Sequence, residues 1–169
     1  GIDRELGRSA QALDAISAAR GPGGSAVPGR DIITHLQLLD PADYARMAAL
    51  GVVAAVQPYW FTKDPDYYRA LHRLVGERAG RQFPMRSFAH AGVPVAGASD
   101  YPVSPPPDPL LAIQRGVLRK DPTAEVENAE LWPEEAVDVE TMIAVRSLSA
   151  SGFAGSGGNS SMLSRRVTE

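Results

Sequence analysis

The 169-residue sequence contains no cysteine, which excludes disulfide bonds, thiolate metal sites, iron–sulfur clusters and a cysteine nucleophile. It also lacks an excess of charge of one sign, because 17 basic residues stand against 20 acidic ones. Without a basic excess or a block of Lys and Arg, we expect neither nucleic acid nor an anionic membrane surface as a partner. The absence of cysteine fits a reducing compartment, and we expect a cytoplasmic protein.

Long hydrophobic runs are absent as well. The longest uncharged apolar stretch, residues 48–60, contains Gly51, Gln57 and Pro58 and is far shorter than the roughly 20 residues of a membrane-spanning helix. The chain is also too short for a complete eight-stranded α/β barrel, which takes about 200–250 residues. Since 44% of its residues are hydrophobic, it can still form one domain with a sizeable core.

Apolar segments of strand length alternate with helical patterns along the chain. We expect strands at 32–34 and 52–57 and a third within 93–100, and helices over 4–20, 41–50, 65–76, 84–90, 109–119 and 139–150. Asp-Pro pairs and single Asp residues mark several helix starts. The alternation predicts a parallel sheet with right-handed crossovers. Residues 155–169 lack apolar periodicity, so we expect a domain over 1–154 and a flexible, non-native tail after it.

Three polar residues, His35, Gln57 and Asp100, stand at or just beyond the carboxyl ends of the expected strands. Functional groups of parallel α/β folds gather at these ends. A neutral imidazole is a common zinc ligand, and a carboxylate can bind a metal or take a proton from an attacking water. Each also has a structural interpretation, a histidine satisfied by local hydrogen bonds and an Asx-turn ahead of Pro102. His72 and His90 are expected to be structural.

Several segments resemble the metal-dependent amidohydrolase superfamily, specifically its amidohydrolase family 3 branch, and they occur in the same order along the chain. The segment ITHLQLLDPADYARMAALGVVAAVQP resembles the sixth and seventh β/α units of that branch. The segment ERAGRQFPMRSFAHAGVPVAGASDYPVSPPPDPLLAIQRGVLR resembles the seventh helix, the eighth strand and the following segment. The resemblance covers residues 1–154. It implies an α/β fold, a partial (β/α)8 TIM barrel made of about its last three β/α units, with parallel strands and covering helices.

The resemblance implies roles for individual residues. His35 matches the metal-ligand histidine after the sixth strand. Asp100 matches the aspartate after the eighth strand, which in the family binds metal and acts as general base. Gln57 matches a residue near the substrate mouth, where it is expected to bind substrate. Arg86 matches an arginine of the same region, which is expected either to position substrate or to have a structural role.

Three aromatic residues follow Gln57 closely in the sequence. Trp60, with Tyr59 and Phe61, can form an apolar wall for a hydrophobic acyl or aryl group of the substrate. Ordinary packing is the favoured interpretation of these rings.

The implied cofactor is one or two divalent metal ions, with zinc as the first choice. The implied reaction is hydrolysis of an amide or other non-peptide carbon–nitrogen bond in a small molecule. The sequence departs from the family, however. It lacks the first-strand His-x-His pair, the metal-bridging ligand of the middle strands and the fifth-strand histidine, and Thr34 stands where Glu is common. Because zinc sites typically use three protein ligands, we expect this chain alone to bind metal weakly and to be inactive.

Two other interpretations remain open. The chain can be a non-catalytic half-barrel that pairs with the missing barrel half or with a second copy of itself, since open edges of parallel strands favour pairing. A flavodoxin-like binding module is the weaker one, because it needs about five strands and only three are visible.

Overall fold

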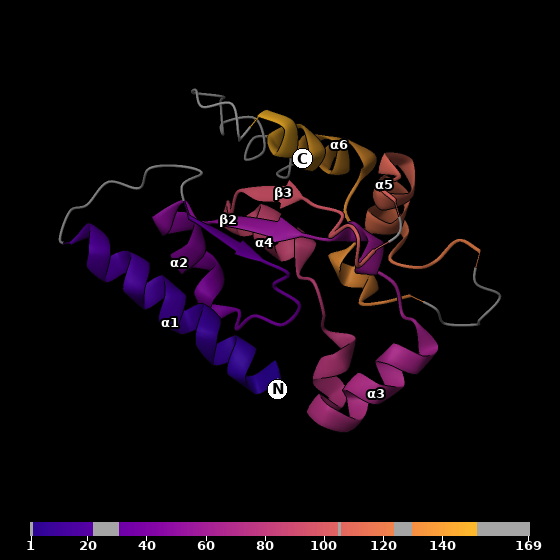
Figure 1. The fold of residues 1–169 in the computed structure, drawn as a ribbon, viewed down its shortest axis with the longest axis horizontal. Coiled ribbons are helices and arrows are strands. Elements are labelled where there is room, and N and C mark those ends of the chain that lie inside the picture. The colour runs from indigo at the N-terminus through magenta and orange to yellow at the C-terminus, as the bar shows by residue number, and fades with distance from the viewer. Residues whose placement is uncertain (1, 22–30, 105, 124–129, 152–169) are drawn as a thin grey trace.

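Three short parallel strands form the centre of the molecule (Figure 1). The computed structural model describes residues 2–21, 31–104, 106–123 and 130–151. Strands β1 (Ile32–Thr34), β2 (Val53–Val56) and β3 (Val95–Gly97) pair in the order β1-β2-β3. The predicted strands and their parallel pairing are confirmed within these residues, although β2 and β3 are shorter than the expected segments.

The helices lie close to the predicted ranges. They are α1 (Ile2–Arg20), α2 (Ala42–Leu50), α3 (Pro65–Val75), α4 (Met85–Ala91), α5 (Pro109–Leu118) and α6 (Val139–Ser151). Asp64, Asp108 and Asp138 accept backbone hydrogen bonds from the first turns of α3, α5 and α6 at 2.7–3.2 Å, as their cap positions predict. The predicted loop over 22–30 and the predicted tail over 155–169 lie outside the described residues.

Several details differ from the sequence prediction, among them the start of α1 at Ile2 and a shift of α4 by one residue. Helix α2 begins one residue later than expected, because Pro41 lies before its first turn while Asp40 accepts a hydrogen bond from the Ala42 amide at 3.0 Å. Three short 3-10 helices were also not predicted: η1 (Pro58–Trp60), η2 (Gly76–Gly80) and η3 (Pro133–Glu135). Turns of three to five residues are too short to produce a periodic pattern.

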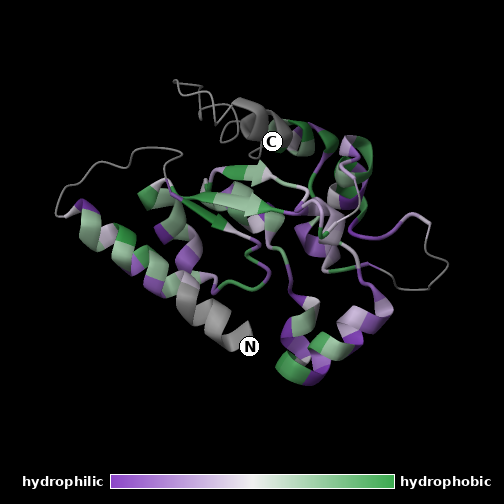
Figure 2. Ribbon diagram, in the orientation of Figure 1, coloured by the Kyte–Doolittle hydropathy of each residue, from purple (hydrophilic) through white to green (hydrophobic). Residues whose placement is uncertain are grey.

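The two faces of the sheet have different surroundings. In register, Ile33, Ala54 and Val95 lie on one face, and this face packs in the main core against Met47 of α2 and Phe88 of α4. Helix α6 contributes the buried Met142 and Val145 to the same core. Figure 2 shows the hydrophobic character of the strands at the centre of these helices.

The other face is only partly covered by the described residues. Ile32 is 50% exposed, Thr34 is exposed, and Val53, Ala55 and Ala96 are half-buried. The three parallel strands pair in the order of the sequence, and their buried face is turned to helices. This arrangement is expected of adjacent β/α units of a barrel. A doubly wound sheet instead changes strand order and carries helices on both faces.

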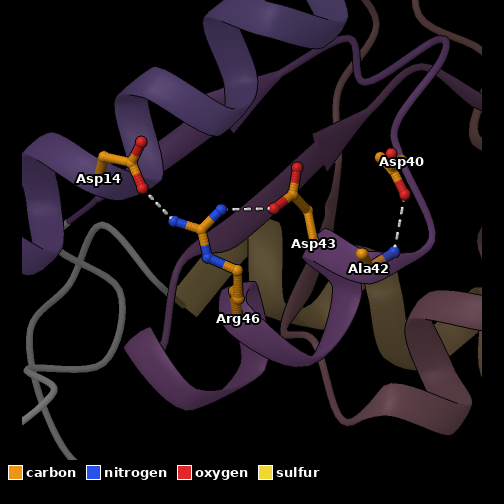
Figure 3. A network of polar contacts seen from close by, with 5 residues as sticks. All are labelled: Asp14, Asp40, Ala42, Asp43 and Arg46. Atoms are coloured by element: carbon orange, nitrogen blue, oxygen red, sulfur yellow. Dashed lines mark hydrogen bonds and ion pairs between the residues drawn. The ribbon is translucent and has the colours of Figure 1, made fainter.

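Helix α1 is fixed beside α2 by apolar side chains and by polar contacts, which include a hydrogen bond from Arg20 to the Leu50 carbonyl and a network around Arg46. Leu13 is fully buried in the main core. Arg46 of α2 reaches Asp14 of α1 and also donates to Asp43 at 2.6 Å (Figure 3). The hydrogen bonds that Arg46 donates to Asp43 and Asp14 raise the pKa of its guanidinium above the ordinary value. The network therefore favours one position of α1 against the helix layer.

A buried guanidinium connects the segments around α5. The Arg119 side chain is fully buried, and its nitrogens donate to the carbonyls of Leu131 at 2.8 Å and Gln82 at 2.7 Å. Its guanidinium carbon lies 4.6 Å from the ring centre of Phe61. Burial lowers the pKa of Arg119 to about 10, and the charge of Glu135 opposes this shift. Arg119 thus holds together three chain segments that are distant in sequence.

A buried carboxylate joins η3 to the start of α4. Glu135 is 5% exposed and accepts hydrogen bonds from the amide and the hydroxyl of Ser87, the former at 2.8 Å. A carboxylate beside the amino end of a helix satisfies donors that the helix itself leaves unpaired.

None of the helices in the described ranges combines the length and hydropathy that crossing a membrane requires.

We expect Glu135→Ala to lower the free energy of unfolding by about 1–3 kcal/mol, because the two donors of the half-buried Ser87 lose a charged acceptor. The neighbouring Glu134 is exposed, so Glu134→Ala is the matched control and changes stability by less than about 0.5 kcal/mol. Urea unfolding followed by circular dichroism measures both. Equal effects of the two substitutions would contradict the assigned role of Glu135.

Candidate active site at the carboxyl ends of the strands

His35 lies in a tight turn immediately after β1. Its amide donates to the Ala55 carbonyl at 2.9 Å, which continues the pairing of β1 with β2. The next amide, that of Leu36, donates back to the Thr34 carbonyl at 2.9 Å, and His35 has a φ of 70°. Thr34, His35 and Leu36 therefore form a γ-turn. Because the central residue has a positive φ, it is the rare and strained form of this turn. Strain of this kind is concentrated at functional sites.

Gln57 links His35 to the end of β1. Its side-chain amide is almost completely buried, at 1% exposure, and follows the last residue of β2. The Oε1 atom lies 3.0 Å from Nδ1 of His35, and Nε2 donates to the hydroxyl of Thr34 at 3.3 Å. The predicted neighbours His35 and Gln57 are therefore in direct contact.

Trp60 covers the His35 ring. The backbone turn of η1, closed by a 2.9 Å hydrogen bond from the Trp60 amide to the Gln57 carbonyl, brings the indole back over the strand ends. The two rings stack with centroids 5.1 Å apart and an interplanar angle of 14°. The indole Nε1 donates to the hydroxyl of Ser104 at 3.0 Å. The orientation of the indole is thus fixed at both its face and its edge.

Asp100 joins this group through the loop after β3. The amide of Ala98 donates to the Val56 carbonyl at 2.8 Å and so continues the pairing of β3 with β2. Asp100 has a φ of 58°, and its carbonyl accepts a 3.0 Å hydrogen bond from the Ser104 amide. Since Ser104 also binds the Trp60 indole, the Asp100 turn is attached to the aromatic ring that covers His35. Within the described ranges, no hydrogen bond or ion pair involves the Asp100 carboxylate.

The other expected site residues have different surroundings. Arg86 is exposed in the first turn of α4, and its Nε donates to the carbonyl of Ala136 at 3.0 Å rather than to the His35 group. Tyr59 and Phe61 are buried, and Phe61 stacks on Phe83 with centroids 5.1 Å apart. Of the three neighbouring aromatic residues, Trp60 is the one that contacts His35.

Two residues of the group had no assigned role from the sequence. Thr34 was noted only as a departure from the family pattern, and Ser104 was part of a proline-rich loop. Trp60 has one local signal in the sequence. It follows Gln57 by three residues, across a Gln-Pro pair, and this short spacing keeps the indole near the end of β2. No sequence pattern connects Ser104 to Trp60, because these residues are 44 positions apart.

His35 and Asp100 carry an imidazole nitrogen and carboxylate oxygens, which are atoms that commonly bind metal ions. The Nδ1 atom of His35 is engaged by Gln57, which leaves Nε2 on the far side of the ring, and the Asp100 carboxylate has no partner among the described residues. However, no cluster of three or more His, Asp or Glu side chains that could hold a metal ion occurs in the part of the chain that the structure describes. Among the described residues, His35 and Asp100 are therefore two candidate ligands that do not by themselves complete a metal site.

Comparison with known proteins gives three concordant findings. The sequence model of the amidohydrolase family matches residues 3–157. A Bacillus subtilis (strain 168) protein named as an amidohydrolase, YtcJ, is 34% identical over 90 residues, which are 53% of this chain and 16% of that protein. The crystal structure of an uncharacterized metal-dependent hydrolase from Pyrococcus furiosus is similar with a TM-score of 0.57 and 21% identity, over 85% of this chain and 26% of that protein. The chain therefore spans about a sixth to a quarter of these relatives.

We expect Ser104→Ala to free the indole N–H of Trp60 and to destabilise the chain by about 1 kcal/mol. In proton–nitrogen correlation spectra, the Trp60 indole signal should shift and exchange faster with solvent. Trp132, the second of the two tryptophans, supplies an internal reference. Ser99→Ala is the matched control, because the Ser99 hydroxyl accepts from Tyr101 and not from Trp60. An unchanged Trp60 signal in Ser104→Ala would show that this contact is not formed.

Proposed function

Since the chain belongs to the amidohydrolase family, we propose that it supplies part of the active site of a metal-dependent hydrolase. The substrate class is a small molecule with an amide or another non-peptide carbon–nitrogen bond. The observation that carries this proposal is the joint placement of His35 and Asp100. Both follow parallel strands, both have a positive φ, and both are connected to the same indole ring, His35 by stacking and Asp100 through Ser104.

His35 acts as a metal ligand in this proposal, and Asp100 acts as a ligand and as the general base. A divalent metal, with zinc as the first candidate, would polarise the scissile carbonyl when bound. The Asp100 carboxylate takes a proton from the attacking water and holds it at a carboxylate oxygen. It then delivers this proton to the departing nitrogen, as general acid–base catalysis requires.

Gln57, Trp60 and Arg86 are proposed at the substrate side of the site. The exposed part of the half-buried Trp60 offers an apolar surface beside His35, which suits an acyl or aryl group. Arg86 lies at the amino end of α4. Its terminal guanidinium nitrogens have no hydrogen-bond partner among the described residues and can contact a substrate while Nε remains bound to the Ala136 carbonyl. Gln57 is too deeply buried to contact more than the innermost part of a ligand.

The remaining metal ligands are proposed to come from strands of the barrel that this sequence does not contain. Two observations support this division. The described residues bring together fewer than three potential ligands, and the chain spans 26% of its Pyrococcus furiosus neighbour. The partly exposed sheet face, which carries Thr34, is the face that the interior of a closed barrel would cover. A cytoplasmic location completes the proposal.

Calorimetric titration of the chain with Zn²⁺ tests the ligand assignment. We expect weak binding, because two ligands rarely hold zinc, and we expect His35→Ala and Asp100→Ala each to remove most of the observed heat. His72→Ala is the matched control, since His72 is paired with Glu77 on the surface. Tight equimolar binding that His35→Ala abolishes would contradict the proposal that the chain lacks some of the metal ligands. Equal heats in all variants would contradict the ligand roles of His35 and Asp100.

A second candidate function is a non-catalytic half-barrel that associates with itself or with the missing half. The exposed Ile32 on the partly covered face of the sheet favours it. Light scattering during size-exclusion chromatography is expected to report twice the mass of one chain if this candidate is correct. Ile32→Lys would then shift the protein toward the monomer, whereas Leu74→Lys, at an exposed leucine of α3, would not. A monomer of the unsubstituted chain at all concentrations would exclude self-association.

A further inference from the structure

We infer that Gln57 is a positioning residue that fixes the tautomer of His35, with the proton on Nδ1 and the lone pair on Nε2. This inference rests on the proposed function, because it concerns the imidazole nitrogen that faces a metal. It assigns Gln57 a different role from contact with substrate.

The backbone and the stacking contact leave His35 little freedom. The γ-turn fixes the direction in which its side chain departs from the sheet. The Trp60 indole lies nearly parallel to the imidazole, so the ring is confined to one plane. The indole itself is held by Ser104. The remaining freedom is a half-turn of the ring, which would exchange Nδ1 for a carbon at the position that faces Gln57.

Gln57 selects between the two ring orientations and between the two tautomers. A carbon facing the buried amide would leave the Oε1 atom without its donor, which is costly at a side chain that is 1% exposed. The Oε1 atom is a carbonyl oxygen and only accepts, so a hydrogen bond at 3.0 Å requires the proton on Nδ1. The Gln57 amide nitrogen donates to Thr34, which fits this orientation of the side chain.

The consequence for metal binding follows from the chemistry of imidazole. A neutral histidine carries one N–H and one lone pair, and a metal binds the nitrogen with the lone pair. Ligand histidines commonly donate their other N–H to an acceptor, which fixes both the tautomer and the ring orientation. With Nδ1–H directed to Gln57, Nε2 on the opposite side of the ring is the metal-facing atom.

His72 provides a contrast within the same chain. Its Nε2 atom, not Nδ1, lies 3.2 Å from the Glu77 carboxylate on the surface. A carboxylate is also an acceptor only, so the neutral form of His72 is expected to carry its proton on Nε2. The two histidines should therefore have opposite tautomers.

The test is nitrogen NMR of the chain with labelled histidine, at a pH of about 8.5, where ordinary imidazoles are neutral. Two-bond proton–nitrogen correlations distinguish the two tautomers, and the chain has only three histidines. We expect the Nδ1–H pattern for His35 and the Nε2–H pattern for His72. Gln57→Leu should convert His35 to a mixture of tautomers, and Gln57→Glu, which keeps an acceptor, should restore Nδ1–H.

Gln37→Leu is the matched control, because the Gln37 amide binds Tyr67 rather than His35. Backbone amide spectra confirm that each variant is folded. An Nε2–H pattern for His35 in the unsubstituted chain, or an unchanged Nδ1–H pattern in folded Gln57→Leu, overturns the inference.

Addition of Zn²⁺ to the same samples separates this result from the proposed function. A shift of the Nε2 signal of His35 supports the ligand role. An Nδ1–H tautomer that zinc leaves unchanged supports the positioning role of Gln57 and contradicts the ligand role of His35.

Discussion

The register of the three parallel strands is the constraint on which the site depends. Because Ile33, Ala54 and Val95 are aligned, the three strands end at one edge of the sheet. The pairing continues beyond the strands, through the amides of His35 and Ala98. A shift of one residue between β1 and β2 would move side chains to the opposite face and would separate His35 from Gln57. The geometry of the site is therefore set first by backbone hydrogen bonds and only then by its side chains.

Much of the fold could be predicted from the sequence because its signals are local. Asp64, Asp108 and Asp138 each accept hydrogen bonds from the amides of the first turn that follows, so the helix starts are encoded within a few residues. Gly51 and Gly92 end α2 and α4 with a left-handed residue for the same reason. The buried Arg119 is different. It binds the carbonyls of residues 12 and 37 positions away, and no local pattern distinguishes it from an exposed arginine at the end of a helix.

The candidate site divides in the same way. The positions of His35, Gln57 and Asp100 after their strands follow from a general property of parallel sheets, so the sequence predicts that these residues share one edge. The contacts among them do not follow, because they depend on Ser104 and on the orientation of the Trp60 indole. Spacing likewise does not predict that Arg86 binds the Ala136 carbonyl, since that contact joins segments 50 residues apart.

The distribution of buried groups explains how the chain holds the candidate site residues in place. The main core packs on the helix-facing side of the sheet, and His35 and Asp100 are not among its buried residues. The two side chains instead occupy turns with positive φ that the paired strands and the Trp60–Ser104 contact hold in place. Contacts within the chain therefore define both turns. It follows that replacing His35 or Asp100, the two proposed ligands, should affect metal binding far more than folding, whereas changes at Glu135 or Arg119 should do the opposite.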